Sequence, residues 1–290
     1  MAAPHEHAHQ VIEEVFREAL RAVEPRHAVR AALALEDGNL IVGSRRVQLM
    51  DSGRIVVIAI GKAAPAMAQG AADVLGGRID RGVILTKHGH MGAPVPGFDA
   101  YEAGHPVPDD DGVRATAAVI AAVDNLDARD VVVALISGGG SSLLEQPRAP
   151  LTLTDLQETT RLLLHAGANI HELNAVRSVL SRVKGGGLRQ IIGPARCVSL
   201  LLSDVLGNDP TVIASGPTIA AQPSRERAWS VVERYGLAAR LPEVARRMLT
   251  DIADERPSPA RVADDAWVII ADNDALVAEV RRLFEARGLS

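Results

Sequence analysis

Short, uninterrupted runs of Val, Ile, Leu and Ala constrain the fold of this chain more than any other feature. Four of them occupy residues 54–60, 82–87, 130–136 and 196–203, and none alternates regularly between apolar and polar positions. A strand that is apolar on both faces belongs to a parallel sheet that is covered on both sides. The four runs therefore predict the strands of a parallel β-sheet.

Helical patterns fill the intervals between these runs. They cover residues 63–75, 109–126, 152–167 and 171–184. An earlier helical pattern at 8–35 is interrupted at Pro25. Parallel strands joined by helices require right-handed crossovers, which place helices over the sheet. The predicted fold class is α/β, with a doubly wound, mostly parallel sheet and helices on both faces.

The pattern changes after residue 236, and this bears on the domain organisation. A polar stretch at 253–265 separates the preceding helices from a last strand pattern, 266–271, and a last helix pattern. A single strand and helix cannot bury their own apolar faces, so this tail either joins the main sheet or begins a second domain. We expect a first domain at 1–252, a linker at 253–265 and, at 266–290, the beginning of an incomplete second α/β domain.

Composition limits the classes of partner. Aromatic residues make up only 2% of the chain, so small aliphatic side chains must form the core. The net charge is -5 with both signs spread along the sequence, which argues against a nucleic-acid partner. No apolar run reaches the ~18 residues of a membrane span. Cys197 is the only cysteine and lies in an apolar run, so we expect a buried thiol and a reducing, cytoplasmic compartment.

Most of the reactive side chains directly follow a predicted strand. Lys62 comes after the first strand, Lys87 after the second, Ser-Gly-Gly-Gly-Ser-Ser after the third and Ser-Asp-Val-Leu-Gly-Asn-Asp-Pro after the fourth. The carboxyl ends of parallel strands meet at one edge of a sheet, and open α/β sheets bind their ligands there. The sequence therefore predicts a ligand site at that edge.

The glycine-rich segment after the third strand predicts an anion site. Three consecutive glycines allow successive N–H groups to converge on one point, and the flanking serines add hydroxyl donors. The candidate phosphate- or substrate-binding residues are Ser137, Gly138, Gly139, Gly140, Ser141 and Ser142. Phosphate and carboxylate are both open as the ligand. A tight strand-to-helix turn that needs glycine only for its backbone angles is the alternative.

Charged residues at the same edge indicate phosphate chemistry. Lys62 lies in the first turn of a helix pattern, where the helix dipole disfavours a cation unless an anion binds nearby. Asp204 ends a strand and Asp209 follows a short turn, so both are candidate ligands of Mg²⁺ beside phosphates. The alternatives are a solvated lysine and carboxylates that cap turns.

The helix pattern at 171–184 carries further polar candidates. Asn174, Arg177 and Lys184 are separated by three and seven residues, a spacing that places them on one helix face. An arginine there could bind a phosphate or carboxylate with two hydrogen bonds, and a solvated cationic face is the alternative. The sequence contains no Walker-type phosphate loop and no G-x-G-x-x-G after a strand, which weakens a dinucleotide oxidoreductase interpretation.

Six ordered blocks resemble one protein family. They are VIAIGKAAPAMA, GVILTKHGH, EAGHPVPDDDG, LISGGGSSLL, NAVRSVLSRVKGGGL and SDVLGNDPTVIASGPT. The chain resembles the bacterial and archaeal type of glycerate 2-kinase, the family whose C-terminal portion is called the MOFRL domain. The resemblance covers residues 11–217.

The resemblance implies phosphorylation of D-glycerate at its 2-hydroxyl with ATP and Mg²⁺. It also implies a Rossmann-like N-terminal domain, with the active site in the cleft against a second α/β domain. The functional lysine of the family falls on Lys62 and its acidic residue on Asp204, the two expected catalytic residues. The chain departs from the family in two ways: Asn208 replaces the first Asp of the usual Gly-Asp-Asp, and the family members are much longer.

Two other functions stay open at this point. A hydroxypyruvate reductase, a name often attached to relatives of this family, needs a nicotinamide site that the sequence does not contain. A shortened chain that binds glycerate or nucleotide without turnover is the alternative of another class. Whether the protein forms a homodimer is also open.

Overall fold

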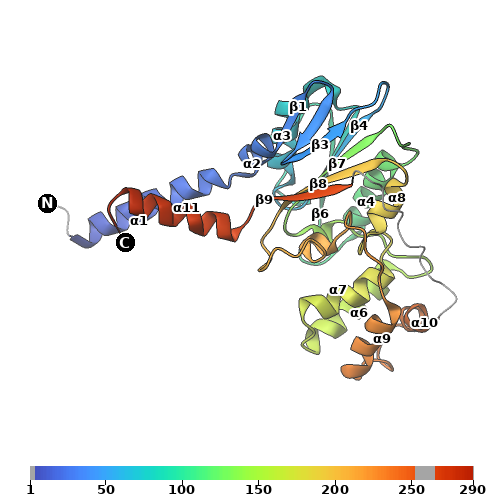
Figure 1. Ribbon diagram of the computed structural model, residues 1–290. Coiled ribbons are helices and arrows are strands. Elements are labelled where there is room, and N and C mark those ends of the chain that lie inside the picture. Colours follow the sequence, from blue (N-terminus) through green and yellow to red (C-terminus); the bar gives the residue numbers. More distant parts are fainter. Residues whose placement is uncertain (1–3, 252–264, 290) are drawn as a thin grey trace.

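Six parallel strands form the main sheet of the computed structural model, which describes residues 4–251 and 265–289. The strands are β4 (Ile55–Ile60), β5 (Arg81–Lys87), β6 (Phe98–Ala103), β7 (Val131–Ile136), β8 (Arg196–Leu202) and β9 (Ala266–Ala271). Their order is β6-β5-β4-β7-β8-β9, and every neighbouring pair is parallel. The sheet extends in one direction from β4 and in the other from β7, so the doubly wound α/β class is confirmed (Figure 1).

Helices cover both faces of the sheet, and each face has its own core. On one face, α2 (Pro25–Ala32) and α3 (Ala64–Leu75) pack over Val57 and Ala59 of β4. On the other face, α4 (Asp110–Val123) and α8 (Gly187–Ile192) pack over Ile58 and Ile60. Every residue of β4 is buried, which explains why its sequence shows no alternation.

A three-stranded antiparallel sheet lies between the first helices and β4. Its strands, in spatial order, are β1 (Leu33–Glu36), β2 (Asn39–Val42) and β3 (Arg45–Gln48). The predicted helical segment 8–35 is interrupted at Pro25 as expected, between α1 (Pro4–Ala22) and α2, but its end is wrong because β1 begins at Leu33. Asp37 and Gly38 both have positive φ and form the turn to β2, since an Asp-Gly pair favours a hairpin.

The strand β6 is a second element that the search for apolar runs missed. Its sequence, FDAYEA, contains two acidic residues, and only Ala103 is fully buried. It forms one edge of the main sheet and pairs with β5 alone. An edge strand with a partly solvated face does not need an apolar run.

Four helices form a separate group, which lies below the sheet in Figure 1 and which we call the helical subdomain. They are α6 (Leu153–His165), α7 (Ile170–Leu180), α9 (Arg225–Arg234) and α10 (Glu243–Thr250). Their apolar faces share a core of their own, in which Leu163 and Val176 are fully buried. Both α6 and α7 begin with a capping box, which fixes where each helix starts.

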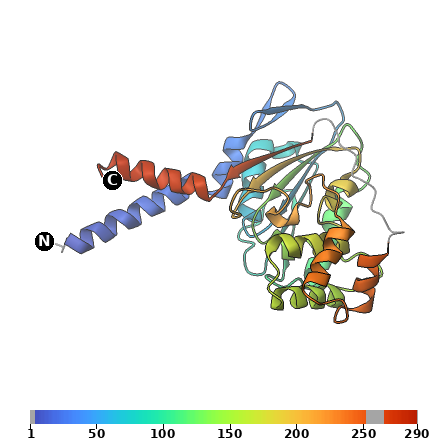
Figure 2. The same cartoon turned by 60° about the horizontal axis from the view of Figure 1, so that its bottom comes forward.

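The last strand joins the main sheet. β9 pairs with β8 from Val198 and Ala266 onward, which is one of the two alternatives that the sequence left open for this segment. α11 (Asn273–Ala286) then packs against α1, and the two helices project from the body (Figures 1 and 2). Across the described ranges, no helix combines the length and hydropathy needed to cross a bilayer. The expected linker at 253–265 lies outside the described residues except for Asp265, and the domain limits stay predictions.

Candidate active site

The strand order reverses between β4 and β7, and the loops that follow these two strands lie side by side. The N–H of Lys62, after β4, donates to the carbonyl of Gly138, after β7, at 2.9 Å. Gly61 has a φ of 123°, and a Cβ there would lie 2.2 Å from Ser137 Oγ, so only glycine fits. Doubly wound sheets bind ligands at such a reversal. Lys62 and the glycine loop, residues 137–142, therefore stand where this fold binds its ligands.

Two of the predicted serines bind the backbone. Ser137 is 1% exposed, and its Oγ accepts a hydrogen bond from Ala63 N at 3.1 Å and donates to Ile60 O at 3.4 Å. Ser142 Oγ donates to Gly139 O at 3.1 Å. These hydroxyls stabilise the conformation of the two loops, which is a structural role.

The glycines of the loop make room for side chains from other strands. A Cβ at Gly138 would lie 2.2 Å from Asp204 Oδ2. A Cβ at Gly139 would lie 3.1 Å from Lys62 Cε and 3.2 Å from His105 Cδ2, and Gly139 has a left-handed φ of 87°. A carboxylate, an ammonium group and an imidazole thus meet at two consecutive glycines.

Positive charge gathers around His105. Burial and the neighbouring charges of Lys62, Lys87 and His90 lower the pKa of His105, so its imidazole is neutral at pH 7. Lys87 ends β5 and His90 lies in the loop that follows; the position of Lys87 at this edge was expected. His105 was given no role because it follows β6, the strand that the sequence did not reveal. The cluster suits an acidic ligand.

The two predicted metal ligands differ in their surroundings. Asp204 is exposed after β8, and its carboxylate has no hydrogen-bond partner in the described part of the chain. Asp209 Oδ1 accepts bonds from the N–H and hydroxyl of Thr211 at 2.9 and 2.7 Å, the turn-capping alternative for this residue. Asn208 Nδ2 donates to Asp272 Oδ2 at 2.6 Å. Mg²⁺ is often held by one carboxylate with phosphate oxygens and water, and Asp204 fits that donor set.

A chain of hydrogen bonds joins the glycine loop to α7. Ser141 Oγ lies 2.8 Å from Ser215 Oγ, which donates to Asn174 Oδ1 at 2.9 Å. Asn174 is 8% exposed, and its Nδ2 has no hydrogen-bond partner among the described residues. A buried donor without an acceptor costs free energy, which a ligand or water can recover. Asn174 is therefore placed to bind a ligand that reaches Ser141.

Arg177 and Lys184 contact the backbone in and just after the glycine loop, and the expected helix face shared by Asn174, Arg177 and Lys184 is wrong for Lys184. Because α7 ends four residues before Lys184, that lysine lies beyond the helix, and it is fully buried. Its Nζ lies 2.8 Å from Glu145 Oε2 and donates to Leu144 O at 2.7 Å. Arg177 is also buried and donates to Ser141 O. The alternative of a solvated cationic face is also wrong, because Arg177 and Lys184 are both buried.

Glu145 is a residue of this site that sequence reasoning missed. It is fully buried, and its Oε2 lies 3.9 Å from Arg177 as well as beside Lys184. Burial lowers the pKa of Lys184 to about 8, so this lysine is mostly charged at pH 7. Two cations against one carboxylate leave excess positive charge beneath the loop, which favours an anion above it. A glutamate within the apolar run LLEQP was the available signal.

A second group of potential metal ligands lies at the start of α4. His88 Nε2 is 3.1 Å from Asp109 Oδ2 and 3.6 Å from Asp111 Oδ2, and the three ligand atoms lie within 4.8 Å of one another. Asp109 Oδ1 also accepts from Gly112 N and so caps the helix. Helix capping and ion pairing account for these contacts, and we assign no metal to them.

Comparisons with known proteins show the family to which the chain belongs. A family model described as "Domain of unknown function (DUF4147)" matches residues 11–250. The D-glycerate 2-kinase of Thermotoga maritima is 42% identical over 224 residues, which cover 77% of this chain and 50% of that protein. A relative from Agrobacterium vitis, named only provisionally as a hydroxypyruvate reductase, is 40% identical over 280 residues, 96% of this chain and 60% of its own.

A solved structure extends the agreement to the fold. The crystal structure of glycerate kinase from Thermotoga maritima has a TM-score of 0.83 and 36% identity, and the match covers 98% of this chain and 63% of that chain. The chain spans half the length of the D-glycerate 2-kinase that it matches. The family model matches most of the chain, so the chain belongs to the DUF4147 family, and its similar relatives and solved structures include glycerate kinases.

Proposed function

We propose that this chain carries the active site of a kinase that phosphorylates D-glycerate at its 2-hydroxyl, using ATP and Mg²⁺ and giving 2-phosphoglycerate and ADP. The observation that supports it most is the meeting of Lys62 and Asp204 at Gly138 and Gly139, where the strand order reverses. Phosphoryl transfer depends on positioning and on neutralising charge, for which a lysine and a metal-binding carboxylate serve. The name of the Thermotoga maritima relative supports the same activity.

The residues have separate roles in this proposal. Lys62 neutralises negative charge on the phosphoryl group as it passes from ATP to the glycerate oxygen. Asp204 holds Mg²⁺, which supplies charge neutralisation on the phosphates when bound. The N–H groups of the glycine loop and Ser141 bind phosphate or the substrate carboxylate, above the buried charges of Arg177 and Lys184. Asp209, which caps its own turn, is a weaker candidate for the metal.

Product analysis tests the proposal. We expect this chain, incubated with ATP, Mg²⁺ and D-glycerate, to release ADP and a phosphoglycerate that ³¹P NMR identifies as the 2-isomer. Because the chain spans only half of its kinase relative, a longer form of the protein is measured in parallel. Absence of phosphoglycerate from both forms would contradict the proposal.

Two rival functions are measured in the same samples. Consumption of NADH or NADPH with hydroxypyruvate would support the reductase, for which the provisional name of the Agrobacterium vitis relative is the present support. Binding of ATP or glycerate without turnover, in both forms, would support a binding protein.

The cellular setting and the oligomeric state are also proposals. Cys197 is buried, and burial raises its pKa to about 12, which makes the thiol inert. The reducing, cytoplasmic compartment stays a proposal that rests on the single cysteine of the chain. The side chains of Ile12 and Phe16 on α1 are 57% and 50% exposed, and an apolar stripe of this kind favours a homodimer. Sedimentation of the chain would show whether it is a monomer or a dimer.

A further inference from the structure

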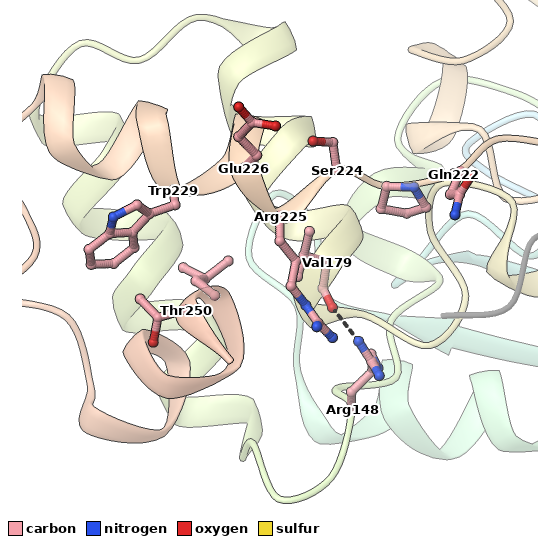
Figure 3. A pocket seen from close by; sticks show the side chains of 10 residues that line it. Arg148, Val179, Gln222, Ser224, Arg225, Glu226, Trp229 and Thr250 are labelled. Carbon is pink, nitrogen blue, oxygen red and sulfur yellow. Dashed lines mark hydrogen bonds between the residues drawn. The ribbon is translucent and has the colours of Figure 1, made fainter. Parts of the chain in front are cut away.

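A cavity of 670 Å³ lies in the helical subdomain, among α7, α9 and α10 (Figure 3). Its walls include Arg148, Val179, Gln222, Arg225, Trp229 and Thr250. The candidate active site uses none of these side chains. The volume is in the range of sites that bind small organic ligands, about 300–1,000 Å³.

A smaller hollow adjoins this cavity and shares wall residues with it. It measures 170 Å³, and it shares Gln222 and Ser224 with the large cavity. Asn174 and Ser178 of α7 line the small hollow, and Val179 lines the large one. Both spaces lie against α7, and we call the two together the groove. One end of the groove is Asn174, which is linked to the glycine loop through two hydroxyl groups.

The side chains follow a definite order along the groove. In the view of Figure 3, the indole of Trp229 lies at one side of the large cavity and Gln222 at the other, with the guanidinium groups of Arg225 and Arg148 and the carboxylate of Glu226 between them. Arg148 NH1 donates to Val179 O at 3.1 Å, and Arg225 NH1 donates to Asp251 O at 2.6 Å. These bonds hold both cations in the wall of the cavity.

This order matches the order of groups in a nucleoside triphosphate. An aromatic face stacks with a base, and guanidinium groups bind phosphate oxygens. The amide of Asn174 then offers a donor that has no partner among the described residues. From Trp229 to Asn174, the groove therefore presents a surface for the base, then cations, then a hydrogen-bond donor for an anion.

We propose that this groove binds the nucleotide, with its base against Trp229 and its phosphates directed past Gln222 toward Asn174 and Ser141. The inference rests on the proposed kinase function, because it says where the ATP of that reaction binds. The terminal phosphate then reaches the glycine loop from the α7 side. The side with Lys87 and His105 is then left for the carboxylate of the acid, while Lys62 keeps its role at the transferring phosphoryl group.

The two tryptophans of the chain provide the test. Trp267 is 50% exposed on β9, so Trp267→Phe leaves the cavity unchanged and makes Trp229 the only indole. We expect ADP to change the emission of Trp229 in a saturable way, with the Kd that calorimetry gives for the same variant. In Trp229→Leu, the emission of Trp267 should not respond to ADP, and the calorimetric Kd should rise roughly tenfold or more through the loss of stacking.

The other possible results of these measurements would overturn the nucleotide-binding proposal or the kinase function. Saturable binding of ADP that leaves the emission of Trp229 unchanged would overturn the proposal, as would no binding of ADP. A response of Trp229 to D-glycerate but not to ADP would overturn it too. If the groove binds ADP but the proposed kinase function is wrong, Trp229 will respond to ADP and no 2-phosphoglycerate will form. The Trp267→Phe measurement keeps the test valid even if Trp229→Leu does not fold.

Discussion

Gly138 has a strict steric requirement in the candidate site. Any Cβ there would occupy the position of the Asp204 carboxylate, so the missing side chain is what allows this acid to lie on the loop. The run of glycines predicted close approach to the backbone, and that prediction holds for Gly138 and Gly139. The groups that approach them in the structure are side chains from β4, β6 and β8, which no local pattern could indicate.

Substitution of Gly138 tests this arrangement. We expect Gly138→Ala to displace Asp204, to lower kcat at least tenfold and to raise the Mg²⁺ concentration needed for half-maximal activity. Gly77→Ala is the matched control, since a Cβ at Gly77 meets no atom within 4 Å. Equal kcat values and Mg²⁺ requirements in the two variants would show that Asp204 does not need its present position.

Lys184 illustrates why the burial of single residues was harder to predict. Its spacing from Arg177 suggested a shared helix face. However, α7 ends before Lys184, and the side chain of Lys184 is buried beside Glu145. Burial of a charge follows from packing between distant segments, and spacing in the sequence does not reveal it. Glu145 was missed for the same reason.

The pH dependence of unfolding tests the burial of Lys184. In the unfolded chain its pKa is 10.5, and in the folded chain it is about 8, so the unfolded state binds more protons between these values. The free energy of unfolding should therefore rise with pH across that window, by about 3 kcal/mol relative to Lys184→Met. Lys87→Met, the control, should keep the rise. Parallel pH profiles for wild type and Lys184→Met would mean that the lysine is not buried as a cation.

Among the helices and strands, the sequence predicted best the strands that are buried along their whole length. β4, β5, β7 and β8 are covered on both faces or lie between other strands, and their apolar runs were recognised with bounds close to the observed ones. β1, β2 and β3 are short strands with a polar face, and β6 is an edge strand, so none of them carries such a run. The helical subdomain was expected as helices, but its separate core depends on contacts among distant segments.

The separate core of the helical subdomain leads to a prediction for two adjacent positions of α6. Leu163 is fully buried among the four helices, whereas Leu164 is 55% exposed. We expect Leu163→Ala to lower the free energy of unfolding by about 2–5 kcal/mol, and Leu164→Ala by less than about 1 kcal/mol. Urea unfolding of both variants measures the difference. Similar losses at the two positions would argue against the helical subdomain as described.

At the scale of the whole molecule, the parallel sheet presents Lys62, the glycine loop and Asp204 along one edge, and the helical subdomain adds the groove along α7. The doubly wound class was predictable because strand and helix patterns alternate along the chain. The position of the helical subdomain beside the glycine loop was not predictable. It depends on how the long segment between β7 and β8 packs with the segment after β8. Together these parts support the proposal that phosphoryl transfer to glycerate occurs at the strand reversal.

The turnover of Lys62→Ala tests this claim most directly. The measurement is kcat for the formation of 2-phosphoglycerate from ATP and D-glycerate, in whichever length of the protein is active. Arg78→Ala is the control, because Arg78 is exposed in the 3₁₀ turn (Gly76–Arg78) at the far end of α3. We predict that Lys62→Ala lowers kcat roughly a hundredfold to a thousandfold and that the control leaves kcat unchanged. Near-normal turnover without Lys62 would contradict it.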